Sequence, residues 1–247
     1  MAAHDSKSDR LSAHGDRFAT THWSMVVSAG GSRSPEASRA LATLCEDYWF
    51  PLYAFVRRAG YTVDDAQDLT QEFFVRLLAQ RFFAKADRQK GKFRSFLLAA
   101  MKHFLADQWD RKHAQKRGGT QTVISFDGLD AETRYGLEPA TKLTPEKMFE
   151  KQWALALLEH VLSRLDVEMT SDGKKALFEA LKDTLTGARS IGYAAIGAEL
   201  GMSEGAVKVA AHRMRRRYRA LLREEIAQTV ASSDEISDEI RYLLSCL

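Results

Sequence analysis

The chain has 247 residues, of which 45% are hydrophobic and 28% are charged, with only four prolines. This length and composition indicate an ordered protein with one large core or two small ones, and they exclude a disordered or collagen-like chain. The net charge of +3 is small, but acidic and basic residues are segregated along the sequence, which favours charged partner surfaces.

Cysteine usage and the first residues favour the cytoplasm. Cys45 and Cys246 are far apart and belong to no Cys-x-x-Cys or His/Cys metal pattern, which argues against a disulfide scaffold and a zinc site. Residues 1–17 are polar, lack the apolar core of a signal peptide and are expected to be disordered. No apolar run approaches membrane-spanning length. We therefore predict a cytoplasmic protein with no cofactor and no membrane contact.

The first half of the chain has the apolar periodicity of three helices. The first is expected over residues 36–59, kinked or split by Pro51 and ended by Gly60. The second is expected over residues 63–80, and the third from residue 94 into the cationic stretch that ends at residue 117. No strand pattern of any length appears, so the predicted fold class is all-α.

The second half begins with a predicted flexible linker over residues 118–144, which are rich in Gly, Thr, Asp and Pro. Thr144 and Pro145 provide an N-cap and a first-turn proline for a helix that runs to about residue 166. Another helix is expected at 174–185. A last, acidic-headed amphipathic helix should open at Ser233. Its expected apolar face consists of Ile236, Ile240, Leu243 and Leu244.

Residues 193–218, YAAIGAELGMSEGAVKVAAHRMRRRY, read as two short helices separated by a turn. Gly201 can take the left-handed conformation that ends the first helix, and Ser203 can cap the second. This pattern is typical of a helix-turn-helix motif, whose second helix enters the major groove. The alternative is a solvated basic helix in an ordinary bundle. The expected DNA-binding residues are Ser203, Glu204, Lys208, Val209, His212, Arg213, Arg215, Arg216 and Arg217.

Residues 92–117, KFRSFLLAAMKHFLADQWDRKHAQKR, interleave aromatic rings with cations. Unpaired bases stack on rings while cations follow the nucleic-acid backbone, so this pattern suggests a single-strand contact. Phe96 and Phe104 lie eight residues apart on one helix face and fit a core instead. The candidate contacts are Lys92, Arg94, Lys102, His103, Trp109, Arg111, Lys112, Lys116 and Arg117.

Residues 64–74, DDAQDLTQEFF, form an acidic stripe on a predicted helix. The carboxylates of Asp65, Asp68 and Glu72 should face solvent, and no histidine accompanies them, which argues against catalysis and metal binding. The stripe favours docking on a basic protein surface. A solvated face that needs no partner would look the same.

The chain resembles a bacterial RNA polymerase sigma factor of the extracytoplasmic-function group. The resemblance lies in the order of the acidic helix, the K-x-F-R-x-F-L basic-aromatic helix, the linker and the segment YAAIGAELGMSEGAVKVAAHRMRRRY. The resemblance covers residues 36–225. It implies a promoter-specific initiation factor, not an enzyme. It also implies two small helical domains joined by the linker. The expected divisions are an N-terminal extension at 1–35, a region-two-like domain at 36–117, a linker at 118–144, a region-four-like domain at 145–225 and a C-terminal extension at 226–247.

The resemblance also assigns partners. The region-two domain of this family binds the clamp helices of the polymerase β′ subunit and melts the minus-ten element. The region-four domain binds the minus-35 element and the β flap. Here residues 93–117 would meet the opened strand, and residues 208–217 would read the minus-35 box. The residues that would meet β′ are Asp64, Asp65, Gln67, Asp68 and Glu72.

Three positions depart from the family pattern. Gln67 stands where the acidic tetrad commonly has a glutamate, which removes one charge from the polymerase-facing helix. Phe96 stands where a tryptophan is usual, and His103 where an asparagine is frequent, so the family's base preference at minus ten does not transfer. A phosphate on Thr70 or Thr62, added by a Ser/Thr kinase, could replace the missing charge. The alternative is that Thr70 is an ordinary helix residue and that Asp64, Asp65, Asp68 and Glu72 suffice.

Two further hypotheses concern regulation and class. The acidic C-terminal helix could cover a cationic DNA-binding surface in the free protein, and an anti-sigma factor is another candidate partner. A stand-alone helix-turn-helix regulator that does not replace the housekeeping sigma factor explains residues 193–218 equally well. An enzyme is not expected, because the sequence has no P-loop, G-x-S-x-G or dinucleotide fingerprint.

Overall fold

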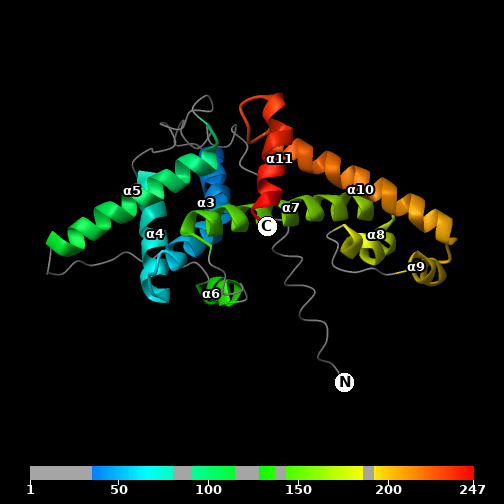
Figure 1. Cartoon of the computed structure of the whole chain (residues 1–247), viewed down its shortest axis with the longest axis horizontal. Helices are drawn as coiled ribbons and strands as arrows, with labels where there is room; N and C mark the ends of the chain where they lie inside the picture. The colour runs from blue at the N-terminus through cyan, green and yellow to red at the C-terminus, as the bar shows by residue number, and fades with distance from the viewer. Residues whose placement is uncertain (1–34, 80–90, 115–127, 137–142, 186–191) are drawn as a thin grey trace, which may run out of the picture. The chain divides into compact units, whose positions relative to one another are not determined.

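The computed structural model describes residues 35–79, 91–114, 128–136, 143–185 and 192–247. All regular secondary structure in these ranges is helical, which confirms the all-α class (Figure 1). The chain divides into two compact units. The first, here called the composite unit, draws on residues 17–157 and 227–247, and the second, the helix-turn-helix unit, draws on residues 158–226.

The composite unit begins with α3 (Pro35–Arg58) and α4 (Val63–Ala79). α3 continues through Pro51, so the expected split at this proline does not occur. The flanking residues from Tyr48 to Val56 are all buried, and this packing outweighs the hydrogen bond that proline cannot donate. Gly60 follows α3 with φ at 99°, the left-handed region expected for its role as a helix terminator.

α5 (Phe93–Ala114) and α6 (Gly128–Gly136) follow. α6 lies within residues 118–144, which the sequence predicted to be a flexible linker, so this prediction is wrong for residues 128–136. Glu132 of α6 accepts hydrogen bonds from Arg57 Nε at 3.0 Å and Nη2 at 2.9 Å and from the Tyr53 hydroxyl. This contact with α3 stabilises a nine-residue helix that has too few turns to be stable alone.

α7 (Pro145–Ser171) contributes to both units. Its start confirms the predicted cap, because the backbone N–H of Lys147 donates to the Thr144 hydroxyl at 3.3 Å. In its first part, the Trp153 indole donates to the Tyr48 hydroxyl of α3 at 3.1 Å. The division between the units therefore lies inside α7, between Leu157 and Leu158, and differs from the expected division at residue 145.

Aromatic contacts fill the core of the composite unit. Tyr48 meets Phe93 edge to face at a centroid distance of 5.5 Å, and Phe73 meets Phe104 at 5.6 Å. Phe104 is thus a core residue, as expected, whereas Phe96 is only half-buried. Cys45 of α3 is also buried, and this burial raises the pKa of its thiol to about 12, so the thiol is not ionised near neutral pH.

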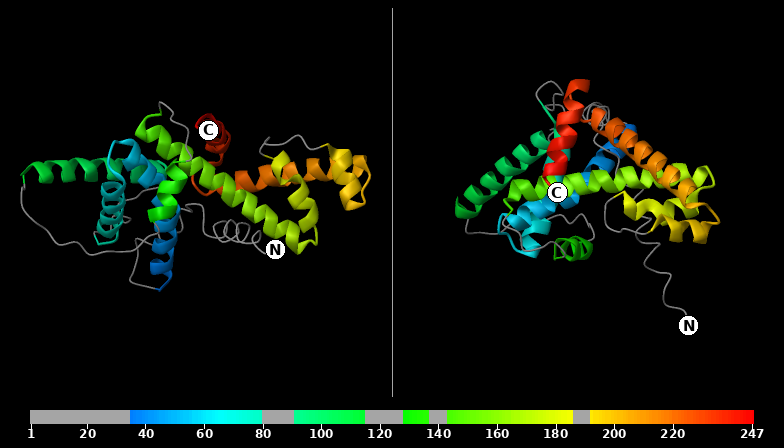
Figure 2. Two further views of the ribbon diagram at one scale, coloured as in Figure 1. Left: turned by 90° about the horizontal axis from the view of Figure 1, so that it is seen from below. Right: turned by 45° about the vertical axis from the view of Figure 1, so that its right-hand side comes forward.

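The helix-turn-helix unit consists of the later part of α7, then α8 (Lys175–Leu181), η3 (Lys182–Thr184), α9 (Tyr193–Leu200) and α10 (Glu204–Ala227). Val161 and Leu165 continue the predicted apolar stripe of α7 and are buried. α9 lies at the N-terminal end of the long α10 in each view (Figures 1 and 2).

The C-terminal segment forms η4 (Ser233–Glu235) and α11 (Ile236–Ser245), which belong to the composite unit. The expected helix is present, and Ile236 and Leu243 are buried as predicted. Ile240 is half-buried, and the prediction is wrong for Leu244, which is 54% exposed. Glu239 of the same helix is a buried charge, at 2% exposure. The pairing of Glu239 with two cations, described below, explains its burial.

Candidate nucleic-acid interface

The turn between α9 and α10 has the geometry that the sequence predicted. Gly201 ends α9 in the left-handed conformation with φ at 65°. The Ser203 hydroxyl accepts a hydrogen bond from the backbone N–H of Ala206 at 3.2 Å and so caps α10. These local interactions set the direction in which α10 leaves the turn.

A second glycine in this motif was not found by sequence reasoning. A Cβ atom on Gly197 would lie 2.6 Å from the backbone carbonyl oxygen of Met202. The Gly197 carbonyl accepts two hydrogen bonds from this turn, one from the Gly201 N–H and one from the Met202 N–H. Gly197 is therefore required for the close approach of α9 to the turn, and its spacing of four residues from Gly201 was the available signal.

α10 has one buried face and one exposed face. Val207, Ala211 and Met214 are at most 3% exposed and pack inward. On the other side, Val209 is half-exposed to solvent at 50% although it is apolar. The predicted contacts on the exposed side are Ser203, Glu204, Lys208, Val209, His212, Arg213 and Arg216. The structure thus brings seven of the nine predicted residues to one accessible surface, which we call the α10 surface.

The remaining two predicted residues, Arg215 and Arg217, are half-buried. Arg215 Nη2 donates to the Tyr193 hydroxyl at 2.9 Å. Arg217 donates twice to Glu168 of α7, at 2.7 Å from both Nε and Nη2. The hydrogen bonds from Arg217 lower the pKa of the Glu168 carboxyl despite partial burial. Arg217 therefore joins α10 to α7 in the free chain, and its predicted DNA contact stays a prediction.

Lys208 and Glu204 form an ion pair on the α10 surface at 2.6 Å, one helical turn apart. Both side chains are at least half exposed. Exposed ion pairs of this kind contribute at most about 1 kcal/mol to stability. Separating Lys208 from Glu204 to bind an anion would therefore need little free energy.

α5 carries the second predicted surface. Lys102, His103, Trp109 and Arg111 are exposed, and the Trp109 ring is 58% accessible. Lys102 pairs with Glu146 of α7 at 2.8 Å, and its hydrogen bond lowers the pKa of that carboxyl. We call these four residues the α5 surface. The side chain of Lys112 and the whole of Lys116 and Arg117 lie outside the described residues.

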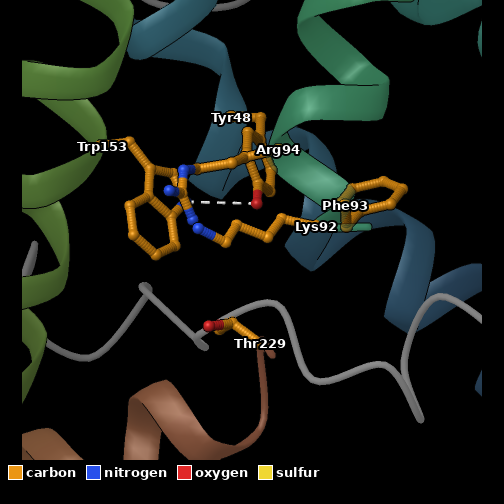
Figure 3. A pocket seen from close by; sticks show the side chains of 6 residues that line it. All are labelled: Tyr48, Lys92, Phe93, Arg94, Trp153 and Thr229. Carbon is orange, nitrogen blue, oxygen red and sulfur yellow. Dashed lines mark hydrogen bonds between the residues drawn. The ribbon is translucent and has the colours of Figure 1, made fainter. Parts of the chain in front are cut away.

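The two predicted contacts at the start of α5 behave differently. Arg94 is 2% exposed, so the free chain does not present it as an accessible DNA contact, and its predicted role stays a prediction. Its guanidinium pairs with Glu150 at 2.7 Å and with Glu239. The guanidinium carbon lies 4.7 Å from the centroid of the Trp153 ring, and Figure 3 shows these two side chains together. Lys92 is partly exposed and also pairs with Glu239. Burial opposes the charge on Arg94, but the two carboxylates raise its pKa.

Of the three α4 carboxylates expected to face solvent, Asp68 is exposed, whereas Asp65 and Glu72 are half-buried. Ala66, Leu69 and Phe73 face the core, whereas Asp64 and Asp68 are exposed. Glu72 pairs with Arg76 at 2.6 Å. Asp65, Gln67 and Glu72 are half-buried. The α4 surface, defined by Asp64, Asp65, Gln67, Asp68 and Glu72, therefore remains available to a partner.

The two threonines proposed as phosphorylation sites differ in access. Thr70 is 0% exposed and its hydroxyl donates to the Ala66 carbonyl at 2.7 Å. A kinase cannot reach this hydroxyl in the folded unit, so the prediction for Thr70 is wrong. Thr62 is exposed and caps α4 by accepting a hydrogen bond from the Asp65 N–H at 3.2 Å. Its phosphorylation stays a prediction.

Comparisons with protein-family models, with curated proteins and with solved structures found no match for this chain. Within the described ranges, none of the helices combines the length and apolar character needed to cross a membrane. No group of three or more His, Cys, Asp and Glu side chains in those ranges is placed to hold a metal ion. The charged and aromatic surfaces of α4, α5 and α10 are thus the candidate functional sites.

Proposed function

We propose that the chain is a promoter-specific transcription initiation factor that binds RNA polymerase core and promoter DNA. The observation that carries the proposal is the helix-turn-helix geometry around Gly201 and Ser203, with the α10 surface exposed. In this motif the second helix lies in the major groove, and its first turns reach the base edges.

The α10 surface supplies the two kinds of contact that such a helix needs. Lys208 and His212 lie one turn apart near the start of α10 and can donate to base acceptors, while the exposed Val209 offers an apolar contact to a thymine methyl group. Arg213 and Arg216 follow at the next turn and suit phosphates. This division gives sequence selection to the first turns and affinity to the later ones.

The α5 surface supports a second, single-strand contact. The exposed Trp109 ring can stack on an unpaired base, and Lys102 and Arg111 can follow the strand's phosphates. Such a contact favours opened DNA over duplex, because bases in a duplex are already stacked on each other. We propose that it holds the minus-ten region after melting.

The α4 surface supports the polymerase contact. Two exposed carboxylates, Asp64 and Asp68, together with Asp65 and Gln67, present an acidic face that is complementary to a basic protein surface. The chain would then act as an adaptor that performs no bond chemistry of its own and needs no cofactor. Its expected site of action is the cytoplasm, where polymerase and promoter meet.

Run-off transcription with purified core polymerase tests this proposal. An initiation factor should direct a discrete transcript from its promoter without any other sigma factor. A stand-alone helix-turn-helix regulator would bind duplex DNA but yield no transcript until another sigma factor is added. Failure to bind core polymerase and failure to produce a transcript would together reject the initiation-factor proposal.

A further inference from the structure

At the start of α5, two cations pair with a carboxylate from a distant part of the chain. The first turn of α5, residues 93–96, contains no acidic residue, although the N-terminus of a helix favours negative charge. Lys92 and Arg94 add two cations at the same place. The carboxylate of Glu239 pairs with both, although it is 147 residues from Lys92 in the sequence.

The two carboxylates around Arg94 are not equivalent. Glu150 belongs to α7, which is anchored in the core by Phe149 and Trp153, at 0% and 1% exposure. Glu239 belongs to α11, a helix of ten residues near the end of the chain. If Glu239 were removed, Arg94 would keep its pair with Glu150. Lys92 would lose its pairing with Glu239, and one side of the Arg94 guanidinium would be left for another anion. Glu239 is thus the exchangeable partner.

α11 is held by two buried apolar side chains, by Glu239, and by the Tyr242 ring, whose centroid lies 5.5 Å from Lys92 Nζ and 5.7 Å from the Arg94 guanidinium carbon. Ile236 and Leu243 are its buried apolar residues, and Glu239 is its buried charge. Tyr242 and Leu244 are 46% and 54% exposed. Segments with little buried apolar surface open at a lower free energy than the rest of a fold. Release of α11 is therefore expected to leave the remainder of the composite unit folded.

We infer that Lys92, Arg94 and the N-terminus of α5 form a binding site for a nucleic-acid backbone phosphate, which Glu239 occupies in the free chain. A phosphate provides the same negative charge and acceptor oxygens as the carboxylate. Strand binding therefore displaces α11, and α11 docking lowers strand affinity by competition. The identification of this phosphate as part of a DNA strand rests on the proposed function; the site itself does not.

The first test compares Glu239→Gln with Asp238→Asn in the full-length chain. Both changes remove one negative charge, but Asp238 is 77% exposed and pairs only with its neighbour Arg241 among the described contacts. The probe is fluorescein-labelled oligo(dT), which needs no knowledge of the promoter, and the readout is anisotropy. Glu239→Gln should bind about tenfold more tightly than Asp238→Asn, because the competing carboxylate is gone. Equal affinities of the two variants would overturn the inference.

A second pair leaves the net charge unchanged. Leu243 is 4% exposed and anchors α11, whereas its neighbour Leu244 is 54% exposed. Leu243→Ala should weaken α11 docking and tighten oligo(dT) binding, and Leu244→Ala should change neither. If Leu243→Ala and Leu244→Ala bind oligo(dT) with the same affinity, α11 does not compete with the strand. Loss of oligo(dT) binding in both Leu243→Ala and Glu239→Gln would contradict the competition as well.

Hydrogen exchange of the wild-type chain needs no substitution. Saturating oligo(dT) should increase amide exchange in residues 236–245, since the strand displaces α11. Unchanged protection at saturation would overturn the inference. Run-off transcription separates this result from the fate of the proposed function. Promoter-specific transcripts without α11 release would refute the phosphate site alone, and α11 release without transcripts would refute the initiation factor alone.

Discussion

The two basic helices, α5 and α10, both carry more cations than carboxylates but differ in their surroundings. α10 buries small and apolar residues such as Ala211, so its cations at Lys208, Arg213 and Arg216 reach solvent. At the start of α5, Arg94 is buried between two carboxylates that come from distant parts of the chain. The difference shows that a run of cations predicts an exposed basic surface only where distant carboxylates do not enclose its members.

The largest expected effect concerns the turn that orients α10. Gly197→Ala would place a Cβ atom 2.6 Å from the Met202 carbonyl oxygen, and the resulting strain should destabilise the chain by about 1–3 kcal/mol. Gly205→Ala is the matched control, because its Cβ meets nothing within 4 Å and alanine favours a helix. Urea denaturation measures both. Equal stabilities would show that the close approach is not required.

The next effect separates accessible from engaged arginines on one helix. Arg213→Ala should weaken promoter-duplex binding by about 1–3 kcal/mol, with little change in stability because Arg213 is exposed. Arg217→Ala should lower stability, since Arg217 joins α10 to Glu168, but should alter duplex affinity less. Anisotropy and thermal denaturation of both variants check this. A greater loss of affinity in Arg217→Ala would reverse the assignment.

A third effect tests whether the α5 surface prefers opened DNA. Trp109→Ala should reduce single-strand affinity by about 1–3 kcal/mol, the contribution of stacking on one base. Trp109 is 58% exposed, so its removal should leave the melting temperature nearly unchanged. Duplex affinity provides the internal control, because duplex binding is assigned to α10. An equal loss for duplex and single strand would argue against stacking.

The smallest effect concerns the carboxylate that holds α6. The hydrogen bonds from Arg57 lower the pKa of Glu132 despite its partial burial. The folded chain therefore binds fewer protons at Glu132 than the unfolded chain does. The stabilisation is present above the unfolded pKa, about 4.3, and is lost as pH falls through the folded pKa.

Glu132→Gln should accordingly cost about 1 kcal/mol at pH 7, and its difference from wild type should shrink below about pH 4. Denaturation at both pH values measures this difference. Asp172→Asn is a suitable control, because Asp172 lies in the other unit, is 61% exposed and pairs with the exposed Lys174. A cost for Glu132→Gln that does not depend on pH would rule out the ion pair as its cause.

Features set by neighbouring residues were predictable from the sequence. Gly201 and Ser203 shape the turn through contacts within four residues, and Thr144 caps α7 in the same local way. Features set by distant residues were not predictable. Glu132 meets Arg57 across 75 positions and Glu239 meets Lys92 across 147. Local patterns carry no record of such pairings, so both α6 and the burial of Arg94 were missed.

Initiation-site mapping on fragmented genomic DNA tests the central claim most directly. Three reactions are compared, containing core polymerase alone, core with the wild-type chain, and core with Arg213→Ala. Discrete transcript starts should require the wild-type chain and should be weakened by Arg213→Ala. Starts identical to those of core polymerase alone would contradict the central claim.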